Sequence, residues 1–120
     1  MDATILVPTE HAEQVVVVNW LTRRGVVFFA VPNGGKRGPV TGRLLKSEGV
    51  QAGVPDVIII SPPPKHQGKV GVALEMKRVV GGRVTTEQAE WLIEFERAGW
   101  LTIVGRGCEN AIKQLQEAGY

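Results

Sequence analysis

The chain has 120 residues, of which 43% are hydrophobic and 22% are charged, and its formal net charge is +2. This length and composition are typical of one globular unit, so we expect residues 1–120 to form a single domain with one core. The sequence holds no apolar run long enough to span a bilayer, no signal-peptide pattern and a single cysteine, Cys108. We therefore expect a cytoplasmic protein without membrane attachment or an internal disulfide.

The first half of the chain predicts a helix, a strand and a short second helix. Thr9 is a good N-cap for a helix that runs to about Arg24 and carries one apolar stripe: Val15, Val18 and Leu21, with Trp20 beside them. Residues 26–31 read as an apolar strand, which the turn residues 32–35 (Pro-Asn-Gly-Gly) close. The basic stretch from residue 36 to residue 51 leaves room for a short helix at about residues 42–47.

The second half alternates strands and helices. Residues 57–60 are β-branched and indicate a strand buried on both faces, and residues 70–80 alternate as a second strand after a proline-rich loop. A capping box of Thr85 and Gln88 begins a helix that reaches about residue 98. Its expected inner face holds Ala89, Leu92, Phe95 and Ala98. Residues 100–104 form a further strand, and residues 108–118 a last helix with Ala111, Ile112, Leu115 and Ala118 inward. This order predicts an α/β fold with a mixed central sheet flanked by helices.

Three charged residues converge on neighbouring predicted strands. Glu75 and Lys77 are two positions apart, so period-two geometry puts both on one face of one strand. Asp56 stands where the chain enters the adjacent buried strand and is expected to share that face. Charged side chains on a central strand are costly to bury unless they pair or bind a metal. Two interpretations follow: an ion-pair network that braces the sheet, or a metal-dependent catalytic centre.

Phosphodiester hydrolysis accounts for this set of residues. The carboxylates of Asp56 and Glu75 are hard oxygen ligands of the kind that Mg²⁺ or Mn²⁺ prefers, and they leave positions for water. Such an ion activates its water and stabilises the attacked phosphate. The backbone carbonyl of Met76 can face the metal as a further ligand, and the Lys77 ammonium would orient the water or neutralise developing charge. We therefore predict Mg²⁺ or Mn²⁺ as the cofactor.

Several stretches resemble the VRR-NUC (virus-type replication-repair nuclease) family of the PD-(D/E)XK nuclease superfamily, and together they cover nearly the whole chain. Their order and spacing are far more specific than the Glu-Met-Lys triplet alone. The stretches are residues 10–14 (EHAEQ), 32–35 (PNGG), 53–56 (GVPD), 74–78 (LEMKR), 85–92 (TTEQAEWL), 98–100 (AGW) and 104–107 (VGRG).

The resemblance implies a restriction-endonuclease-like core and a metal-dependent, structure-selective endonuclease for branched DNA such as Holliday junctions. Stand-alone copies, encoded largely by phages and bacteria, are expected to form homodimers, so DNA and a second copy are the expected partners. The family pattern assigns Asp56 and Glu75 as metal ligands, Lys77 as the catalytic lysine, and Gln88 as a helix glutamine near the lysine, water or phosphate.

The family pattern also implies an acidic metal ligand on the first helix. Glu10 is the expected residue, bound directly or through water, and Glu13 is its competitor. Glu10 lies in the first helical turn, where the helix dipole already favours a carboxylate, so helix stabilisation is its alternative role. Gln88 likewise has the capping box as an alternative role. His11, beside Glu10, is expected to be a surface histidine.

Basic and polar residues gather between the first strand and Asp56. We expect them to contact DNA phosphates, which gives affinity without sequence information: Asn33, Lys36, Arg37, Arg43 and Lys46. A second basic group on the proline-rich loop (Lys65, His66 and Lys69) fits either a DNA contact or a solvated loop. The three tryptophans (Trp20, Trp91 and Trp100) fit core positions better than base-stacking platforms.

Two other functions compete with the junction nuclease. A catalytically silent DNA-binding or scaffold subunit could keep the same fold, but the intact Asp56, Glu75 and Lys77 argue against it. A sequence-specific restriction-type enzyme is the weaker option, since no inserted recognition element is visible in the sequence.

Overall fold

The computed structural model of the protein describes residues 6–32 and 39–120. In chain order its elements are α1 (Glu10–Arg23), β1 (Phe28–Ala30), α2 (Pro39–Ser47), β2 (Val57–Ile59), β3 (Val72–Lys77), α3 (Thr86–Arg97), β4 (Leu101–Arg106) and α4 (Cys108–Glu117). Each element expected from the sequence is present. The strands β1 and β3 are shorter than expected, α2 starts earlier, and β4 runs on to Arg106. In the described parts of the chain, no helix is both long and apolar enough to cross a membrane.

The four strands form one mixed sheet in the order β1-β2-β3-β4. The pairs β1–β2 and β2–β3 are antiparallel, whereas β3 and β4 are parallel. A parallel pair needs a crossover connection, and α3 supplies it. The first residue of β2 and the last residues of β3 therefore lie at the same end of the sheet, because these two strands run in opposite directions.

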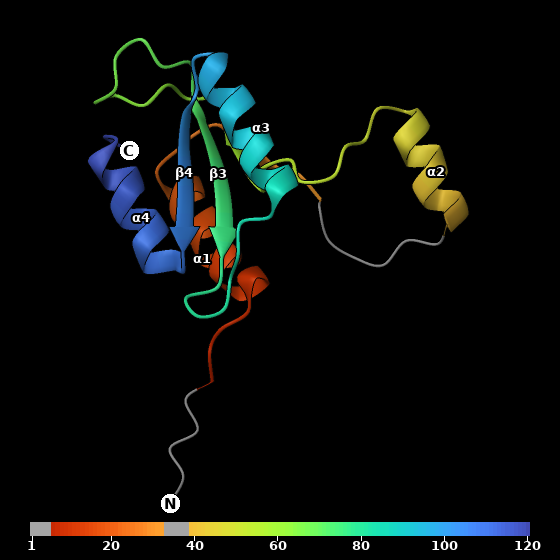
Figure 1. Cartoon of the computed structure of the whole chain (residues 1–120). Coiled ribbons are helices and arrows are strands. Elements are labelled where there is room, and N and C mark those ends of the chain that lie inside the picture. The colour runs from red at the N-terminus through yellow and green to blue at the C-terminus, as the bar shows by residue number, and fades with distance from the viewer. Residues whose placement is uncertain (1–5, 33–38) are drawn as a thin grey trace, which may run out of the picture.

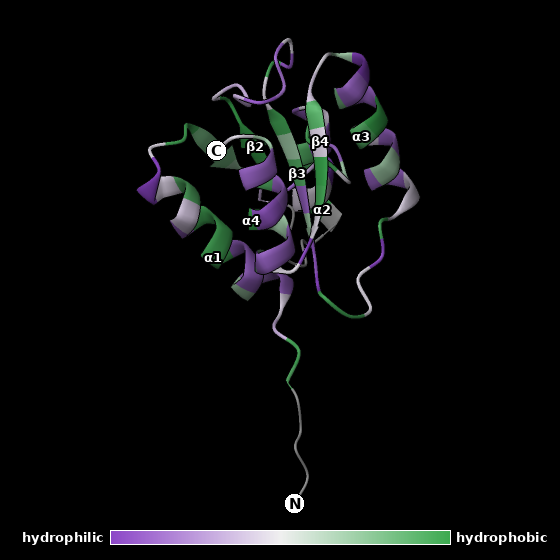
Figure 2. Cartoon of the chain, turned by 90° about the vertical axis from the view of Figure 1, so that its left-hand side faces the viewer, coloured by the Kyte–Doolittle hydropathy of each residue, from purple (hydrophilic) through white to green (hydrophobic). Residues whose placement is uncertain are grey.

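The core lies between the sheet and one pair of helices. Figure 2 shows α1 and α4 on one side of the strands and α3 on the other. Alternate residues of β3 enter the core, as the period-two pattern predicts, and they meet aliphatic side chains of the neighbouring elements. The buried cluster consists of Val17, Leu21, Val57, Ile59, Val72, Leu74, Met76, Ile103, Ala111 and Leu115.

The expected apolar stripe of α1 is confirmed at Leu21 but not at Val15, and Val18 is only half-buried. The residues of α1 that are buried are Glu13, Val17 and Leu21, whereas Val15 is 44% exposed. This register follows from packing against α4, because Glu13 must face the beginning of α4, where its carboxylate is hydrogen-bonded. With Glu13 on the inner face, residues four and eight positions later share that face.

The expected inner face of α3 is confirmed in part, because Ala89, Leu92 and Phe95 are half-buried while most other residues of the helix are exposed. None of the residues of α3, all of which the structure describes, is fully buried, and Ala98 beyond its end is exposed. The helix α3 covers mainly the β4 side of the sheet, and one of its flanks is left open. Across this opening stands α2, which projects away from the sheet (Figure 1).

The two edges of the sheet differ. At the β4 edge, Asn110 Oδ1 accepts the Arg106 N–H at 2.9 Å, and Gln114 Nε2 donates to the Val104 carbonyl at 2.9 Å. Side chains of α4 thus form hydrogen bonds with backbone groups on the outer edge of β4. At the β1 edge, Val27 and Phe29 are 60% and 51% exposed.

Candidate active site

Asp56 is held against β3 by a backbone hydrogen bond. Its Oδ2 accepts the Met76 N–H at 2.7 Å, and its own carbonyl accepts the Val31 N–H at 2.8 Å. Asp56 therefore links the ends of three strands. The N–H and C=O of one strand residue point to the same side, so the Met76 carbonyl faces the Asp56 side of β3 as well.

Glu75 and Lys77 are buried on β3, with 1% and 4% of their surfaces exposed. Lys77 Nζ lies 3.7 Å from Glu75 Oε2. The sheet face opposite the core thus carries an acid and a base in contact, as their spacing predicts.

Gln88 joins α3 to this pair. Its Oε1 accepts from Lys77 Nζ at 2.8 Å, and its Nε2 lies 3.5 Å from Glu75 Oε2. The same Oε1 accepts the Thr85 N–H at 2.9 Å, while the Gln88 N–H donates to Thr85 Oγ1 at 3.1 Å, which completes the capping box. The two roles expected for Gln88 are therefore compatible, since one amide group caps the helix and contacts the lysine.

The carboxyl group of Glu75 is strongly perturbed. Burial raises the pKa of Glu75 to about 9, the neighbouring Asp56 carboxylate adds to this rise, and the Lys77 charge acts in the opposite direction. Among the described residues, Glu75 Oε1 has no hydrogen-bond partner. A buried carboxylate oxygen without a partner is costly, so this atom is suited to receive a cation or a proton.

The two acidic residues of α1 have different positions. Glu10 lines a cavity of about 470 Å³ together with Asp56, Glu75 and Gln88. Its charge also contributes to the raised pKa of Glu75. Glu13 is 7% exposed and accepts the Cys108 N–H at the beginning of α4, so it lies outside this cavity lining. Gly107, the N-cap residue of α4, has no side chain to cap the helix, and the Glu13 carboxylate supplies the cap instead. Burial is the main cause of the raised pKa of the Cys108 thiol, and the Glu13 carboxylate raises it further.

The cavity also contains residues that the sequence did not single out as site residues. Gln14 and Val18 line it with Glu10, and Val15, Val31 and Pro32 complete that wall. The spacing of Glu10, Gln14 and Val18, each four residues apart, is the signal that could have placed them on one helix face. The exposed His11 also lines the cavity.

The expected phosphate contacts are only partly described. Arg43 and Lys46 are exposed on α2, whereas Asn33, Lys36 and Arg37 lie outside the described residues. The loop that holds Lys65, His66 and Lys69 connects the other ends of β2 and β3. It is separated from Lys77 by the length of β3, about 20 Å for six strand residues.

The donor atoms at this end of the sheet fit a hard divalent cation. In the described parts of the chain, no three His, Cys, Asp or Glu side chains lie close enough to hold a metal ion together. The direct ligands would therefore be the carboxylates of Asp56 and Glu75 and the Met76 carbonyl, with Glu10 acting through water. One or two carboxylates with several retained waters is the usual coordination of Mg²⁺.

Comparison with known proteins identifies the family. The VRR-NUC domain family model matches residues 8–108, which include every described residue of the acidic centre. A solved structure described as a VRR_NUC domain protein is 25% identical, with a TM-score of 0.71, and the match covers 96% of this chain and 91% of that chain. Among curated proteins, none matches. The fold is thus the restriction-endonuclease-like α/β fold expected from the sequence, and the chain belongs to the VRR-NUC domain family, a nuclease-type family.

Proposed function

We propose that the protein is a Mg²⁺- or Mn²⁺-dependent endonuclease that hydrolyses phosphodiester bonds in branched DNA such as Holliday junctions. The observation that carries this proposal is the network of Asp56 and Gln88 around the buried Glu75 and Lys77, in which one oxygen of Glu75 has no partner among the described residues. A purely structural ion-pair network would be expected to satisfy that oxygen.

Asp56 and Glu75 would hold the ion in this mechanism. When bound, the ion supplies a Lewis acid and a water of lowered pKa. Glu75 must lose its proton to become a ligand, and a cation in place of that proton removes the penalty of a buried negative charge. The Met76 N–H fixes Asp56 through the 2.7 Å hydrogen bond, so this ligand is oriented before the ion arrives.

Lys77 would act on the attacked phosphate, and Gln88 would hold Lys77 in place. The ammonium of Lys77 is buried and lies at the acidic centre, where it can neutralise the negative charge that develops in the transition state. Gln88 holds this ammonium at 2.8 Å and is itself fixed by the capping box. Gln88 is therefore a positioning residue for Lys77.

A homodimer would place two such centres on the two strands of a junction. The β1 edge supports this assembly, because its exposed Val27 and Phe29 are apolar and the opposite edge is closed by α4 side chains. A symmetric pair of chains matches the symmetry of a four-way junction. The exposed Arg43 and Lys46 on α2 are proposed to contact phosphates.

The experiment that tests the function is cleavage of a labelled substrate panel. The panel contains a four-way junction, a splayed arm, a 5′ flap, a single strand and a linear duplex, each with Mg²⁺, Mn²⁺ or EDTA. The matched variant is Asp56→Asn, which keeps an oxygen for the Met76 N–H but removes the charge. We expect metal-dependent cleavage of the junction by the parent and none by Asp56→Asn, whose folding and DNA binding are retained.

Two results would contradict the proposal. Cleavage by Asp56→Asn at the rate of the parent would remove Asp56 from the centre. Binding of the panel without cleavage under every metal condition would instead favour the silent DNA-binding subunit.

A further inference from the structure

A groove between α2 and α3 lies beside the acidic centre. It has a volume of about 970 Å³, and both helices line it together with residues 49–54. We call it the α2–α3 groove. Val31 and Pro32 line this groove and also the cavity that contains Asp56 and Glu75. The two hollows therefore share a wall, and the groove lies next to the acidic centre.

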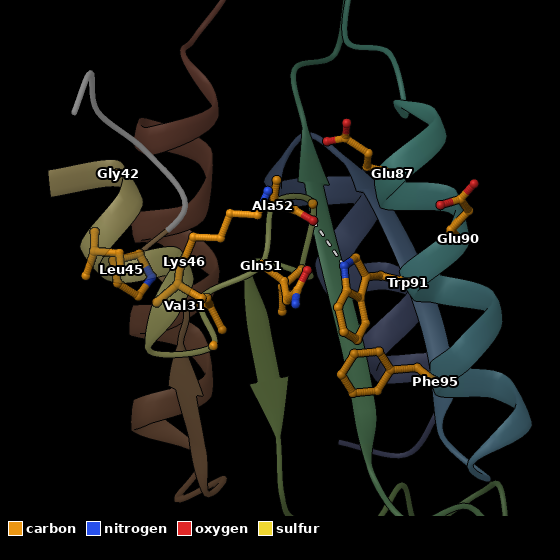
Figure 3. Close-up of a pocket in the computed structure, with 15 residues that line it drawn as sticks. Val31, Gly42, Leu45, Lys46, Gln51, Ala52, Glu87, Glu90, Trp91 and Phe95 are labelled. Carbon is orange, nitrogen blue, oxygen red and sulfur yellow. Dashed lines mark hydrogen bonds between the residues drawn. The ribbon is translucent and has the colours of Figure 1, made fainter. Parts of the chain in front are cut away.

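One wall of the groove is aromatic. Figure 3 shows the rings of Trp91 and Phe95 turned into the hollow from α3. Their centroids are 6.5 Å apart, and the Trp91 Nε1–H donates to the Ala52 carbonyl at 3.0 Å. Trp91 lies outside the buried core cluster, contrary to expectation, yet its only polar group is already bonded. A ring that is held in place but left partly open is suited to stacking rather than to core packing.

The facing wall carries one cation, Lys46, among the described residues that line the groove. Lys46 extends from α2 across the hollow toward Ala52 (Figure 3), and α2 carries Arg43 but no acidic residue. Two glutamates of α3, Glu87 and Glu90, also border the groove, and Glu90 is turned away from it (Figure 3). A cation on one side and an aromatic ring on the other are the two elements with which proteins hold an unpaired nucleotide.

We propose that the α2–α3 groove binds an unpaired nucleotide of the DNA substrate, with its base stacked on Trp91 and its phosphate beside Lys46. This inference rests on the proposed nuclease function and specifies the kind of branch that the enzyme selects. A base exposes its flat face only when it is unpaired or extruded, so a fully paired duplex cannot use this wall. Among branched substrates, those with an unpaired nucleotide beside the cut phosphate would therefore be preferred, and a four-way junction would use the groove by extruding a base at its crossover.

The test measures binding, so it does not depend on cleavage. The probes are a short oligodeoxythymidylate and an abasic strand of the same length, which has the same phosphates but no bases. Binding is followed by the fluorescence anisotropy of a dye at the end of each strand, with EDTA present, so that the signal does not depend on Trp91. The variants are Trp91→Ala, Lys46→Ala and the control Trp20→Phe, whose ring packs against the core and under Arg24 and is not among the described residues lining the groove.

The expected results separate the base from the phosphate. Trp91→Ala should weaken binding of the thymidylate strand by about 5- to 150-fold, the range for losing one stacked base, and should leave the abasic strand unaffected. Lys46→Ala should weaken both strands alike, and Trp20→Phe should change neither. Because α2 stands apart from the sheet, Lys46→Ala should fold normally. Its affinity for the two strands therefore tests the phosphate contact even if Trp91→Ala fails to fold.

Several outcomes would overturn the inference. Equal affinity of the parent for the two strands would show that the groove does not take a base. Unchanged thymidylate binding by a folded Trp91→Ala chain would do the same, and unchanged binding of both strands by Lys46→Ala would remove the phosphate contact. Loss of self-association in Trp91→Ala, with oligonucleotide binding unchanged, would assign the groove to a second copy of the chain. Failure of the nuclease itself would appear differently, as base-dependent binding without cleavage of the substrate panel.

Discussion

Glu75 combines two unfavourable conditions at a single residue, since it is buried and lies beside a second carboxylate. Both conditions disfavour its charged form, and the 3.7 Å contact with Lys77 only partly offsets them. Without a cation the folded protein therefore holds a proton on Glu75 at neutral pH. In the metal-free chain this proton neutralises the Glu75 carboxylate, as the proposed cation would in the metal-bound chain.

Replacing Glu75 with glutamine should change how stability depends on pH. The pKa of Glu75 in the folded protein is about 9, against the ordinary value of 4.5, so folding favours the protonated form. The contribution of Glu75 to stability is then fully present below pH 4.5 and is lost as the pH rises toward 9. We expect metal-free Glu75→Gln to melt at least about 4 °C above the parent at pH 8, a shift that corresponds to ~1 kcal/mol in a domain of this size.

The measurement is a series of thermal melts in EDTA between pH 4.5 and pH 9. The difference between the two chains should vanish at the acidic end. Added Mg²⁺ should raise the melting temperature of the parent at pH 8 but not that of Glu75→Gln, which lacks a ligand. Parallel pH profiles for the two chains would contradict the prediction.

Glu10 and Glu13 allow a matched comparison on one helix. Glu10 lines the cavity of the acidic centre, whereas Glu13 caps α4 through the Cys108 N–H. We expect Glu10→Gln to weaken Mg²⁺ binding about 10-fold with little change in stability, as for outer ligands of metal sites. Glu13→Gln should instead lower the free energy of unfolding by about 1 kcal/mol, as for loss of a charged cap, and leave Mg²⁺ affinity unchanged. Calorimetric titration and urea unfolding distinguish the two, and reversed effects would make Glu13 the helix ligand.

At the scale of elements, the first turn of α3 contacts both the acidic centre and the segment that leads to Asp56. Gly53 packs directly on this turn, because a Cβ at residue 53 would lie 2.9 Å from the backbone carbonyl carbon of Glu87. Gly53 also has a positive φ of 83°. The segment that leads to Asp56 thus reaches the backbone of Gln88 only because residue 53 has no side chain.

Gly53→Ala should therefore destabilise the protein and displace Gln88. We expect a loss of about 1–3 kcal/mol from overpacking, in addition to the strain of a left-handed backbone. The matched control is Gly81→Ala, because Gly81 has nearly the same φ, 81°, and no described atom within 4 Å of the Cβ it would carry. Urea unfolding measures both variants. If both variants lost the same free energy of unfolding, the effect would come from the positive φ alone and not from the contact between residue 53 and Glu87.

Elements with local signals could be predicted from the sequence, and those fixed by distant contacts could not. Thr9 and Thr85 cap their helices as predicted, since a cap depends on residues three positions away. The alternation in β3 likewise placed Glu75 and Lys77 on one face. Glu13 was not predicted to cap α4, because its partner Cys108 is 95 residues away. The residue before α4 is Gly107, which has no side chain to cap the helix. This absence was the one indication in the sequence that a carboxylate from elsewhere would cap α4.

The placement of α2 and α3 had no local signal either. The sequence predicts that both are helices, but amphipathic spacing does not say whether an apolar flank faces the core or a groove. Phe95 and Trp91 have helical spacing suited to an inner face, yet they line an open hollow. For the acidic centre, the residue types and the strand period were enough to bring Asp56, Glu75 and Lys77 together. The unpaired Glu75 oxygen became visible only in the structure.

At the scale of the whole molecule, the unequal edges of the sheet predict how two copies would meet. Replacing Phe29 with lysine puts a charge on the β1 edge, which should prevent edge-to-edge association. We expect the parent to behave as a dimer and Phe29→Lys as a monomer in light scattering after size-exclusion chromatography. Ile93→Lys on α3 is the control, because Ile93 is 49% exposed and Phe29 is 51% exposed. A dimer that persists in Phe29→Lys, or is lost equally in Ile93→Lys, would exclude the β1 edge as the interface.

Residues 52–56 connect the α2–α3 groove to the acidic centre in one short segment. The Ala52 carbonyl fixes the Trp91 ring, Gly53 packs on the turn that holds Gln88, and Asp56 binds the end of β3. A displacement of this segment would move the groove wall and the Asp56 carboxylate together. In steady-state kinetics, changes within it would therefore alter kcat and KM jointly, whereas changes on α2 would alter KM alone. Discrimination among substrates by this enzyme would then be expressed in turnover as much as in affinity.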